Sequence, residues 1–465
     1  MRAREPHRVL ETAVVIGASM AGLCAARVLS ERCRDVVLID RDPLADGADW
    51  RAHVPQGRQP HLLLYAGARL LEEWFPGIGE ELYAGGATEF DVCRDFFWYQ
   101  SGGSLVRPVS RMRGPVMSRP FLEATVRRRV TELPQVTVRE RTTGTGLVTD
   151  ATGQRVTGVR LADGATLSCD LLVDATGRQA KSLAWLKELG YAEPPVSRVT
   201  VNTHYASRVY RRDALPARDW KAAAVIGDPA TKRLAMVLPW EGERWIVGLV
   251  GINGEVPPAD EAGRLAFARS LDSPVIADVM AASQPLGEPV SHRFTANQRR
   301  HVEKLRRFPL GWVMIGDAVC SFDPIYGQGM STAAQQAAAL GACLDRSAAL
   351  DQTFTRRFFR AAARPVVVAW SIAAGGDFMY EGTTGEKPPG TDLLNRYVER
   401  VSVAAQHDAA VCVRFTEVAG LIRRPEWLLT PAFVLRVLRY ARRGPAGARQ
   451  APASPPPLHP HSPGP

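Results

Sequence analysis

The sequence predicts an α/β fold in which a discontinuous Rossmann-like domain is combined with an inserted antiparallel β-sheet domain and a helical C-terminal region. Three observations lead to this prediction: a strand, turn and helix over residues 12–42, long β-runs over 196–252, and a second strand, loop and helix over 311–344. Strands that alternate with helices indicate a parallel sheet, whereas long strands joined by short polar turns indicate an antiparallel one.

The first observation is a βαβ pattern that is typical of a dinucleotide site. An apolar run over 13–16 enters the turn Gly-Ala-Ser-Met-Ala-Gly, a helical stretch follows to about 32, and a second β-run ends on Asp40. Gly17 permits the tight turn and Gly22 close packing of helix on strand, while Ser19 stands where the usual fingerprint has glycine. Asp40 is placed to accept from ribose hydroxyls. A glycine-bearing turn in an ordinary α/β protein is the alternative.

Composition excludes several classes of function. The 465 residues suffice for two or three domains. The seven cysteines form no CxxC pair, so we expect neither a disulfide framework nor a metal site, and we expect a reducing cytoplasm. The basic N-terminus lacks a signal-peptide pattern, and no apolar run approaches the roughly 18 residues of a membrane span. The net charge of +10 comes without a nucleic-acid-binding motif, so we expect a solvated basic surface and no nucleic-acid partner.

The remaining elements are predicted from periodicity and turn residues. We expect helices over 61–74, 121–130, 260–271 and 274–282, and mainly helix over 351–443. We expect strands over 90–99, 104–109, 196–210, 234–239 and 244–252, and a small meander of strands over 136–141, 155–161 and 165–169. Residues 144–146 are interpreted as a β-turn, and residues 444–465, rich in Pro, Ala, Gly and Ser, as a disordered tail.

The stretch over 311–333 carries the most specific pattern. A β-run delivers Gly316 and Asp317, and the loop Asp-Pro-Ile-Tyr-Gly-Gln-Gly then opens into a helix near Met330. A carboxylate at a strand end can accept from a sugar or ribityl hydroxyl. A helix N-terminus aimed at a ring carbonyl stabilises negative charge, which reduced flavin carries around N1 and the C2 carbonyl.

The stretches GASMAG, DATGR and GDAVCSFDPIYGQGM, in this order and separated by a β-rich insertion, resemble the flavin monooxygenases of the para-hydroxybenzoate hydroxylase fold. The resemblance covers about residues 12–345. Its nearest form is the subgroup of polyether-type epoxidases and related natural-product oxygenases, on the pattern Val54-Pro55-Gln56, then His61, and later Asp-Pro-Ile-Tyr-Gly-Gln-Gly-Met.

The resemblance implies which residues hold FAD. Those for the pyrophosphate and the adenosine ribose are Gly17, Ser19, Gly22 and Asp40 with Arg41 beside it, and Arg119 reaches the phosphate or the ribityl chain. Asp174 and Gly177 match the middle motif, which supports the pyrophosphate and is implicated in NAD(P)H use, although Asp-Ala-Thr-Gly here replaces the commoner Asp-Gly. Asp317 binds the sugar or ribityl chain, and the isoalloxazine is lined by Pro324, Gly327, Gln328, Gly329 and Met330.

We expect the FAD-binding domain to span 9–80, 114–180 and 296–345. The substrate domain is expected over 81–113 and 181–295, the C-terminal helical region over 346–443, and the tail over 444–465.

The resemblance implies an FAD-dependent monooxygenase that uses NADPH or NADH and O2. It would epoxidise or hydroxylate an apolar polyketide-like or aromatic natural product, free or bound to a carrier protein, through a flavin C4a-hydroperoxide. No catalytic side chain is assigned. His61 is the one candidate, with a capping or solvated position at a helix start as its alternative. A flavin-dependent reductase of the same fold and a non-catalytic FAD-binding protein are the alternatives. A flavin halogenase would carry a Trp-x-Trp signature, which the sequence lacks.

Several further side chains have two interpretations. Trp240, Trp245 and Cys320 are expected in the core rather than in a site. Near the C-terminus, Arg436, Arg439 and Arg443 share one helical face. The favoured interpretation is a helix packed on the protein's own core by Phe433, Val437 and Tyr440, with solvated arginines. The alternative is weak peripheral contact with anionic lipid or with an acidic carrier protein.

Overall fold

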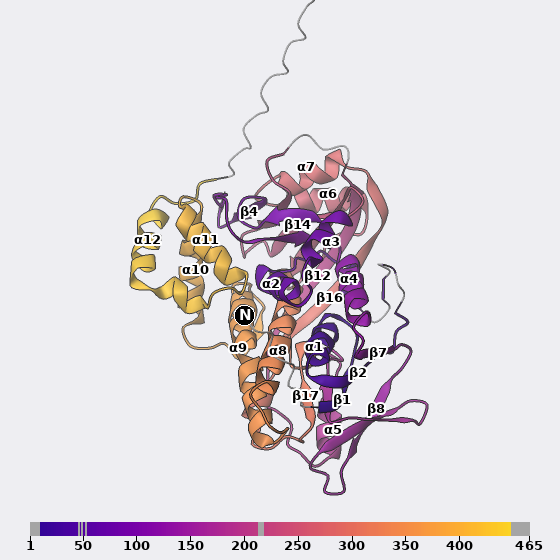
Figure 1. Ribbon diagram of the computed structural model, residues 1–465. Helices are drawn as coiled ribbons and strands as arrows, with labels where there is room; N and C mark the ends of the chain where they lie inside the picture. Colours follow the sequence, from indigo (N-terminus) through magenta and orange to yellow (C-terminus); the bar gives the residue numbers. More distant parts are fainter. Residues whose placement is uncertain (1–9, 45–46, 48–49, 52–53, 213–217, 448–465) are drawn as a thin grey trace, which may run out of the picture.

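A computed structural model describes residues 10–44, 47, 50–51, 54–212 and 218–447. The basic N-terminus and most of the predicted tail lie outside the described residues. The α/β fold class is confirmed, with one parallel sheet, a large and mainly antiparallel sheet, and a helical C-terminal region (Figure 1).

A five-stranded parallel sheet forms the centre of the first layer. Its strand order is β17 (Trp312–Met314), β11 (Leu171–Asp174), β1 (Leu10–Ile16), β2 (Cys33–Ile39) and β7 (Val136–Arg139). The predicted turn sequences at the ends of β1, β11 and β17 therefore meet at one edge, because parallel strands end on the same side. Helices α1 (Met20–Ser30), α4 (Arg119–Thr131) and α8 (Gly329–Leu344) contribute to the core of this layer.

A second, three-stranded antiparallel sheet packs on the same core. It consists of β8 (Gly144–Thr149), β9 (Val156–Leu161) and β10 (Thr166–Ser168). The predicted meander was wrong in one strand, because β7 pairs with β2 in the parallel sheet and β8 takes its place. Residues 144–146, interpreted as a turn, form the start of β8, where a register shift between Gly144 and Gly146 interrupts the alternation that marks a strand.

The large sheet contains nine strands. The order is β18 (Cys320–Ser321), β16 (Pro285–Arg300), β12 (Val196–Arg211), β15 (Arg244–Ile252), β14 (Arg233–Trp240), β13 (Ala222–Ile226), β4 (Phe96–Gln100) and β5 (Gly103–Ser104), and β19 (Thr384–Gly385) pairs with β12. The turn between β14 and β15 is confirmed. Strand β16 was missed because its polar, Pro- and Gly-containing sequence lacks clear alternation. It crosses the expected domain boundary at 295.

Two helices cover this sheet at the top of Figure 1. Helices α6 (Glu261–Arg269) and α7 (Val275–Ala282) pack on it with Trp245, which is 3% exposed. Trp240 is also 3% exposed, so the prediction that both tryptophans belong to the core is confirmed. The connection to the parallel layer is made by η1 (Pro55–Arg58), α2 (Tyr65–Trp74), α3 (Ile78–Ala84), the β-ribbon of β3 (Thr88–Asp91) and β6 (Arg113–Val116), and α5 (Ser182–Glu188).

The C-terminal region is helical as predicted. It contains α9 (Gln352–Asp377), α10 (Thr391–Ala405), α11 (Ala409–Ala419), η5 (Pro425–Leu429) and α12 (Pro431–Ala441). Phe433 and Val437 are buried in its own core cluster. The expected tail begins later than 444, because Gly447 pairs with Gly103 and the Ala446 N–H donates to Gln406 Oε1. Within the described residues, no helix is both long and apolar enough to cross a membrane.

Candidate functional site

The turn after β1 is shaped so that only glycine fits at positions 17 and 22. Gly17 has a φ of +101°, and a Cβ on it would lie 2.6 Å from the carbonyl oxygen of Ala175. A Cβ on Gly22 would lie 1.7 Å from the carbonyl oxygen of Gly17. Ser19 stands at the N-cap of α1 without a side-chain cap bond. A helix N-terminus of this kind presents its first N–H groups to an anion such as a phosphate.

Asp40 closes this turn from the end of β2. Its Oδ2 accepts from the backbone N–H of Ala18 (2.6 Å) and pairs with Arg51 (2.7 Å), while its Oδ1 accepts from the N–H of Asp42 (2.8 Å). The side chain is 7% exposed. Because each carboxylate oxygen has two lone pairs, Oδ1 keeps capacity for a ribose hydroxyl. Arg41, the other residue expected here, is exposed.

Glu123 is the residue at this turn that the sequence reasoning missed. It accepts from Ser19 Oγ (2.9 Å) and from Arg51 Nη1 (2.7 Å), and lies 3.7 Å from Arg119 Nη2. Arg119 Nη2 also donates to Ser19 Oγ (3.0 Å). The signal was present, because Arg119 and Glu123 are spaced i, i+4 on α4 and so share a helix face. Glu123 holds two arginines in place beside the turn.

Arg119 links the turn to His61. Its Nη1 lies 3.5 Å from His61 Nε2, and His61 Nδ1 lies 2.8 Å from the carbonyl oxygen of Gln59. A carbonyl only accepts, so Nδ1 carries the proton and Nε2 presents its lone pair to the guanidinium. Burial, helped by the charge of Arg119, lowers the pKa of His61 to about 3. His61 is therefore neutral at physiological pH and acts as an acceptor.

Asp317 lies at η3 (Gly316–Ala318), directly after β17. Among the described residues no hydrogen bond to its carboxylate is formed. Burial raises the pKa of Asp317, while the charges of Arg119, Arg178 and Arg300 act to lower it. Three cations around one unsatisfied acceptor make a place for a ligand that carries both phosphate and hydroxyl groups. The two further arginines were missed because they come from other elements.

Hydrogen bonds from residues of the large sheet hold the loop over 323–328. Asp323 is fully buried and accepts from Thr203 Oγ1 (2.6 Å) and from the hydroxyl of Tyr205, and its backbone N–H donates to Asn297 Oδ1 (2.7 Å). The loop continues as η4 (Pro324–Tyr326) and ends at Gly327, which has a φ of +64°. These contacts come from β12 and β16, so the large sheet sets the position of the loop.

The same loop is fixed from the side by α9. The Tyr326 hydroxyl donates to Oδ1 of Asp377 (3.0 Å), and Asn297 Nδ2 donates to the other oxygen of this carboxylate. Asp377 is fully buried, and burial together with nearby Asp323 raises its pKa. No sequence signal marks Asp377, because it follows the loop by some fifty residues and its partners are set only by the tertiary fold.

After Tyr326 the chain carries a buried amide oxygen without a described partner and a glycine with free space beside it. Gln328 is 2% exposed and its Oε1 has no hydrogen-bond partner among the described residues. A Cβ on Gly329 would meet no atom within 4 Å, whereas one on Gly327 would lie 3.7 Å from the carbonyl oxygen of Leu62. Residues 62–64 therefore run beside the loop. The side chain of Met330 packs in the main core, so only its backbone is available to a ligand.

The middle motif has a different geometry. Asp174 is fully buried, and its carboxylate accepts from the N–H and hydroxyl of Thr176 and from the hydroxyl of Ser182. These bonds shape the 174–182 loop. Gly177 has a φ of +84° and open space around it. The carboxylate of Asp174 thus acts on its own loop, and the backbone near Gly177 is the part that can face a ligand.

The polar groups of the site fit flavin adenine dinucleotide. An unpartnered Arg119 Nε, an unpartnered Gln328 Oε1 and the free acceptor of Asp317 lie along the turn, the arginines and the loop. Among the described residues no group of three or more His, Cys, Asp or Glu side chains is placed to hold a metal ion. Cys320 is buried as expected, and burial raises the pKa of its thiol.

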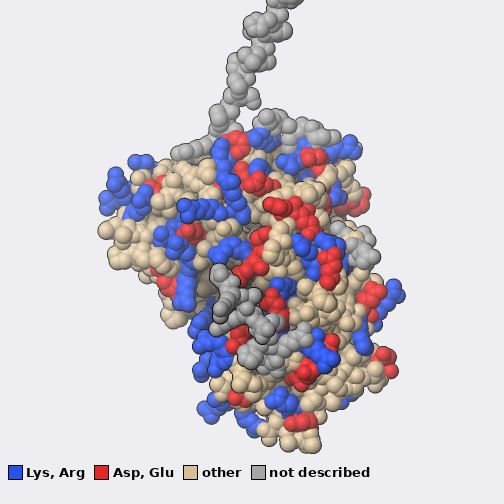
Figure 2. Space-filling model, viewed as in Figure 1, with Lys and Arg blue, Asp and Glu red and all other residues tan. Residues whose placement is uncertain are grey.

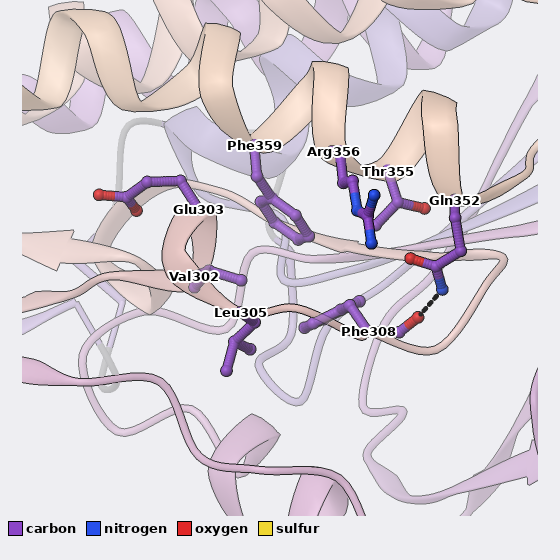
Figure 3. A pocket seen from close by; sticks show the side chains of 8 residues that line it. All are labelled: Val302, Glu303, Leu305, Phe308, Gln352, Thr355, Arg356 and Phe359. Carbon is purple, nitrogen blue, oxygen red and sulfur yellow. Dashed lines mark hydrogen bonds between the residues drawn. The ribbon is translucent and has the colours of Figure 1, made fainter.

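Two cavities lie outside the three motifs. One, of about 10 Å³, lies between η2 (Val302–Lys304) and the first turns of α9, where Gln352 Nε2 donates to the Phe308 carbonyl (Figure 3). It has room for about one water molecule. The other lies between β8, β9 and α5 and is lined by residues such as Arg160 and Glu188. Neither includes a residue of the predicted site.

Two comparisons with known proteins match most of the chain. The model of the FAD binding domain family matches residues 11–349. Protein Rv3254 of Mycobacterium tuberculosis is 34% identical over 397 residues, which are 81% of this chain and 82% of the relative.

Solved structures share the fold at low identity. The flavin-dependent brominase Bmp2 is 16% identical with a TM-score of 0.62, covering 93% of this chain and 98% of that one. The Diels-Alderase PyrE3 is 18% identical with a TM-score of 0.60, covering 89% and 81%. PqsL, a probable FAD-dependent monooxygenase from Pseudomonas aeruginosa, is 18% identical with a TM-score of 0.51, covering 88% and 99%. The chain therefore belongs to the FAD binding domain family and has the fold of these flavoproteins.

Proposed function

We propose that this protein is an FAD-dependent monooxygenase that uses NADPH or NADH and O2 to epoxidise or hydroxylate an apolar polyketide-like or aromatic natural product. The observation that carries the proposal is the loop over 323–329. It presents the unpartnered Gln328 amide and the start of α8, and it lies against residues 62–64. When bound, FAD supplies electron transfer from the nicotinamide and the activation of O2.

The protein's own residues bind and orient the cofactor. The turn at Gly17 and the N-terminus of α1 would hold the pyrophosphate, Asp40 the ribose, and Asp317 with Arg119 the ribityl side. The first N–H groups of α8 and the Gln328 side chain would face the isoalloxazine. A helix N-terminus there stabilises negative charge on the ring.

We expect the side chains of this site to contribute little acid–base catalysis. His61 is neutral and its Nδ1 proton is held by the Gln59 carbonyl, so it contributes an acceptor beside Arg119. The Cys320 thiol is buried and stays protonated. This arrangement suits a reaction in which the protein excludes water and positions substrate.

An apolar substrate is supported by the side chains next to the loop. Leu62 belongs to an apolar cluster on the large sheet that also includes the half-buried Phe96, Val209 and Met236. Ile325 of the loop borders a second cluster around Tyr205 and Phe294. A ring bound against this loop and residues 62–64 would therefore have apolar side chains of both clusters nearby.

The subgroup and compartment are part of the same proposal. The polyether-type epoxidase pattern around Val54 and His61 favours oxygenation of a polyketide-like chain, and the absence of Trp-x-Trp disfavours halogenation. All seven cysteines are free thiols, which suits a reducing cytoplasm.

The test is isotope incorporation. The FAD-loaded protein is incubated with NADPH or NADH, ¹⁸O2 and a panel of polyenes and aromatic phenols, and products are analysed by mass spectrometry. We expect one labelled oxygen atom in a product from at least one compound. Products that gain two hydrogens and no label would establish the reductase alternative, and nicotinamide oxidation with neither product across the panel would contradict the proposed substrate class.

A further inference from the structure

Exposed large apolar side chains concentrate on the outer helices of the C-terminal region. Of the ten in the described part of the chain, five belong to α10, η5 and α12: Leu393, Leu394, Trp427, Leu429 and Leu435. Leu435 is 69% exposed and Leu393 68% exposed. Single exposed apolar residues are ordinary, but a concentration on neighbouring elements marks an interaction surface.

These three elements form one continuous unit. The hydroxyl of Tyr397 on α10 donates to the carbonyl oxygen of Leu428 in η5, and Leu428 is buried with Phe433 and Val437 of α12. The exposed residues therefore surround a shared core, on its outside. In Figure 1 this unit stands at the edge of the molecule, with α12 outermost.

Arginine side chains without acidic partners are interleaved with the exposed leucines. Six exposed arginines in these elements or directly beside them form no ion pair with a described residue: Arg396, Arg400, Arg424, Arg439, Arg442 and Arg443. On α10, Leu393 precedes Arg396 and Arg400, and on α12 Leu435 precedes Arg439, with Arg442 directly after the helix. Residues three, four and seven apart lie on one helix face.

The positive charge is also concentrated in space. The guanidinium groups of Arg436, Arg439 and Arg443 lie 5.9, 5.6 and 5.1 Å from the ring centre of Tyr440. Arg436 is paired with Asp408 through two hydrogen bonds of 2.8 and 2.7 Å, which leaves the other two uncompensated. Figure 2 shows Lys and Arg side chains gathered at this edge of the molecule.

Packing on the protein's own core explains only part of this pattern. Phe433 and Val437 are buried, as that interpretation requires, but Leu435 and the leucines of α10 face outward. A nucleic-acid surface would not need exposed leucines. Leucine and tryptophan that alternate with arginine on an outer face are typical of helices that lie in the headgroup region of a bilayer.

We propose that this α10–η5–α12 surface docks on an anionic phospholipid bilayer. The arginines would pair with lipid phosphates, and Leu393, Leu429, Leu435 and Trp427 would enter the headgroup boundary. The contact is peripheral and would bring the enzyme to a membrane in which apolar compounds collect. The evidence for this contact is the surface alone and does not depend on the flavin chemistry.

Vesicle sedimentation tests the proposal with the full-length, FAD-loaded protein. Vesicles of phosphatidylcholine alone are compared with vesicles that also contain phosphatidylglycerol, at low and at high salt. We expect binding only to the second kind, weakened by salt because exposed charges are screened. The combined variant R439E/R442E/R443E should bind at least about tenfold more weakly.

A matched control carries the same change of charge elsewhere. Arg139, Arg160 and Arg269 are exposed, form no ion pair with a described residue, and lie on β7, β9 and α6. R139E/R160E/R269E should bind like the wild type if the effect is local. The uncharged change L429S/L435S should also weaken binding, because insertion of apolar side chains is part of the contact.

Three results would overturn the proposal. These are no binding of the wild type to phosphatidylglycerol vesicles, an equal loss in the control variant, or full binding by R439E/R442E/R443E. Capture of an acidic soluble carrier protein by a wild type that ignores the vesicles would assign the surface to that partner instead. Folding of each variant is checked by its bound FAD, because none of the residues proposed to hold FAD belongs to this surface.

Discussion

The hydroxyl of Tyr326 donates a 3.0 Å hydrogen bond to Oδ1 of Asp377, and this bond ties the loop proposed to face the flavin ring to α9. Asn297 of β16 donates to the other oxygen of the same carboxylate and also accepts from the Asp323 N–H at the start of the loop. The matched family domain ends at residue 349. A helix beyond that domain therefore supports the loop.

The Tyr326–Asp377 bond is expected to stabilise the protein measurably. Asp377→Ala leaves a buried hydroxyl and a buried amide unpaired, which costs about 1–3 kcal/mol of unfolding free energy, and Tyr326→Phe costs about 1 kcal/mol. Because the two side chains contact each other, the double variant should lose less than the sum of the single losses. Urea unfolding of all four proteins measures this, and strictly additive losses would contradict a direct bond.

Asp317 is expected to be required for FAD. Asp317→Ala removes a partly buried acceptor for a hydroxyl of the cofactor, so FAD affinity should fall about tenfold or more. Asp163→Ala, which changes an exposed aspartate in the turn between β9 and β10, is the matched control. Flavin content after purification and titration with FAD report the effect. An FAD affinity of Asp317→Ala equal to that of the control would contradict a role for Asp317 in FAD binding.

Gly329 separates ligand binding from folding. No described atom lies within 4 Å of the position where its Cβ would be, so Gly329→Val should leave the stability of the FAD-free protein unchanged while FAD binding is lost. Gly327→Val should lower both, because Gly327 has a φ of +64° that β-branched residues avoid. Thermal unfolding without FAD and FAD titration distinguish the two. Normal FAD binding by Gly329→Val would mean that the ring lies elsewhere.

His61 gives a pH dependence of stability. Its pKa of about 3 in the folded protein lies below the ordinary 6.5, so the unfolded chain binds the proton more readily between these values. Stability should therefore fall as the pH is lowered from about 6.5 toward 3. In His61→Gln this fall should be shallower, which urea unfolding at pH 7.5 and at pH 5 would measure. An equal fall in the stability of both proteins would contradict the lowered pKa of His61.

Much of the fold was predictable because its local signals are strong. The turn at Gly17, the hairpin of β14 and β15 and the helices after residue 351 have clear periodicity and turn residues. Strand β16 could not be predicted, because its pairing with β12 and β18 rather than its own sequence pattern defines it. The placement of β7 was wrong for the same reason, because a short strand carries no information on which sheet it joins.

The sequence could group candidate residues that share a motif, but not residues that distant elements bring together. Ser19, Asp40, Arg119 and Asp317 were predicted from motifs and lie around one turn and one set of arginines. Glu123 and Asp377 were missed, since each acts through partners brought together by folding. Asp174 was expected at the pyrophosphate, but its carboxylate is engaged by Thr176 and Ser182.

The most direct test of the proposed function follows the flavin through both halves of the reaction. The FAD-loaded protein is reduced anaerobically with NADPH or NADH, then mixed rapidly with oxygenated buffer in the presence of a compound that the isotope experiment identifies, while absorbance is recorded. We predict reduction by at least one nicotinamide, then an absorbance transient that belongs to neither the reduced nor the oxidised spectrum. No reduction by either nicotinamide, or direct return to the oxidised spectrum with that compound present, would contradict the account.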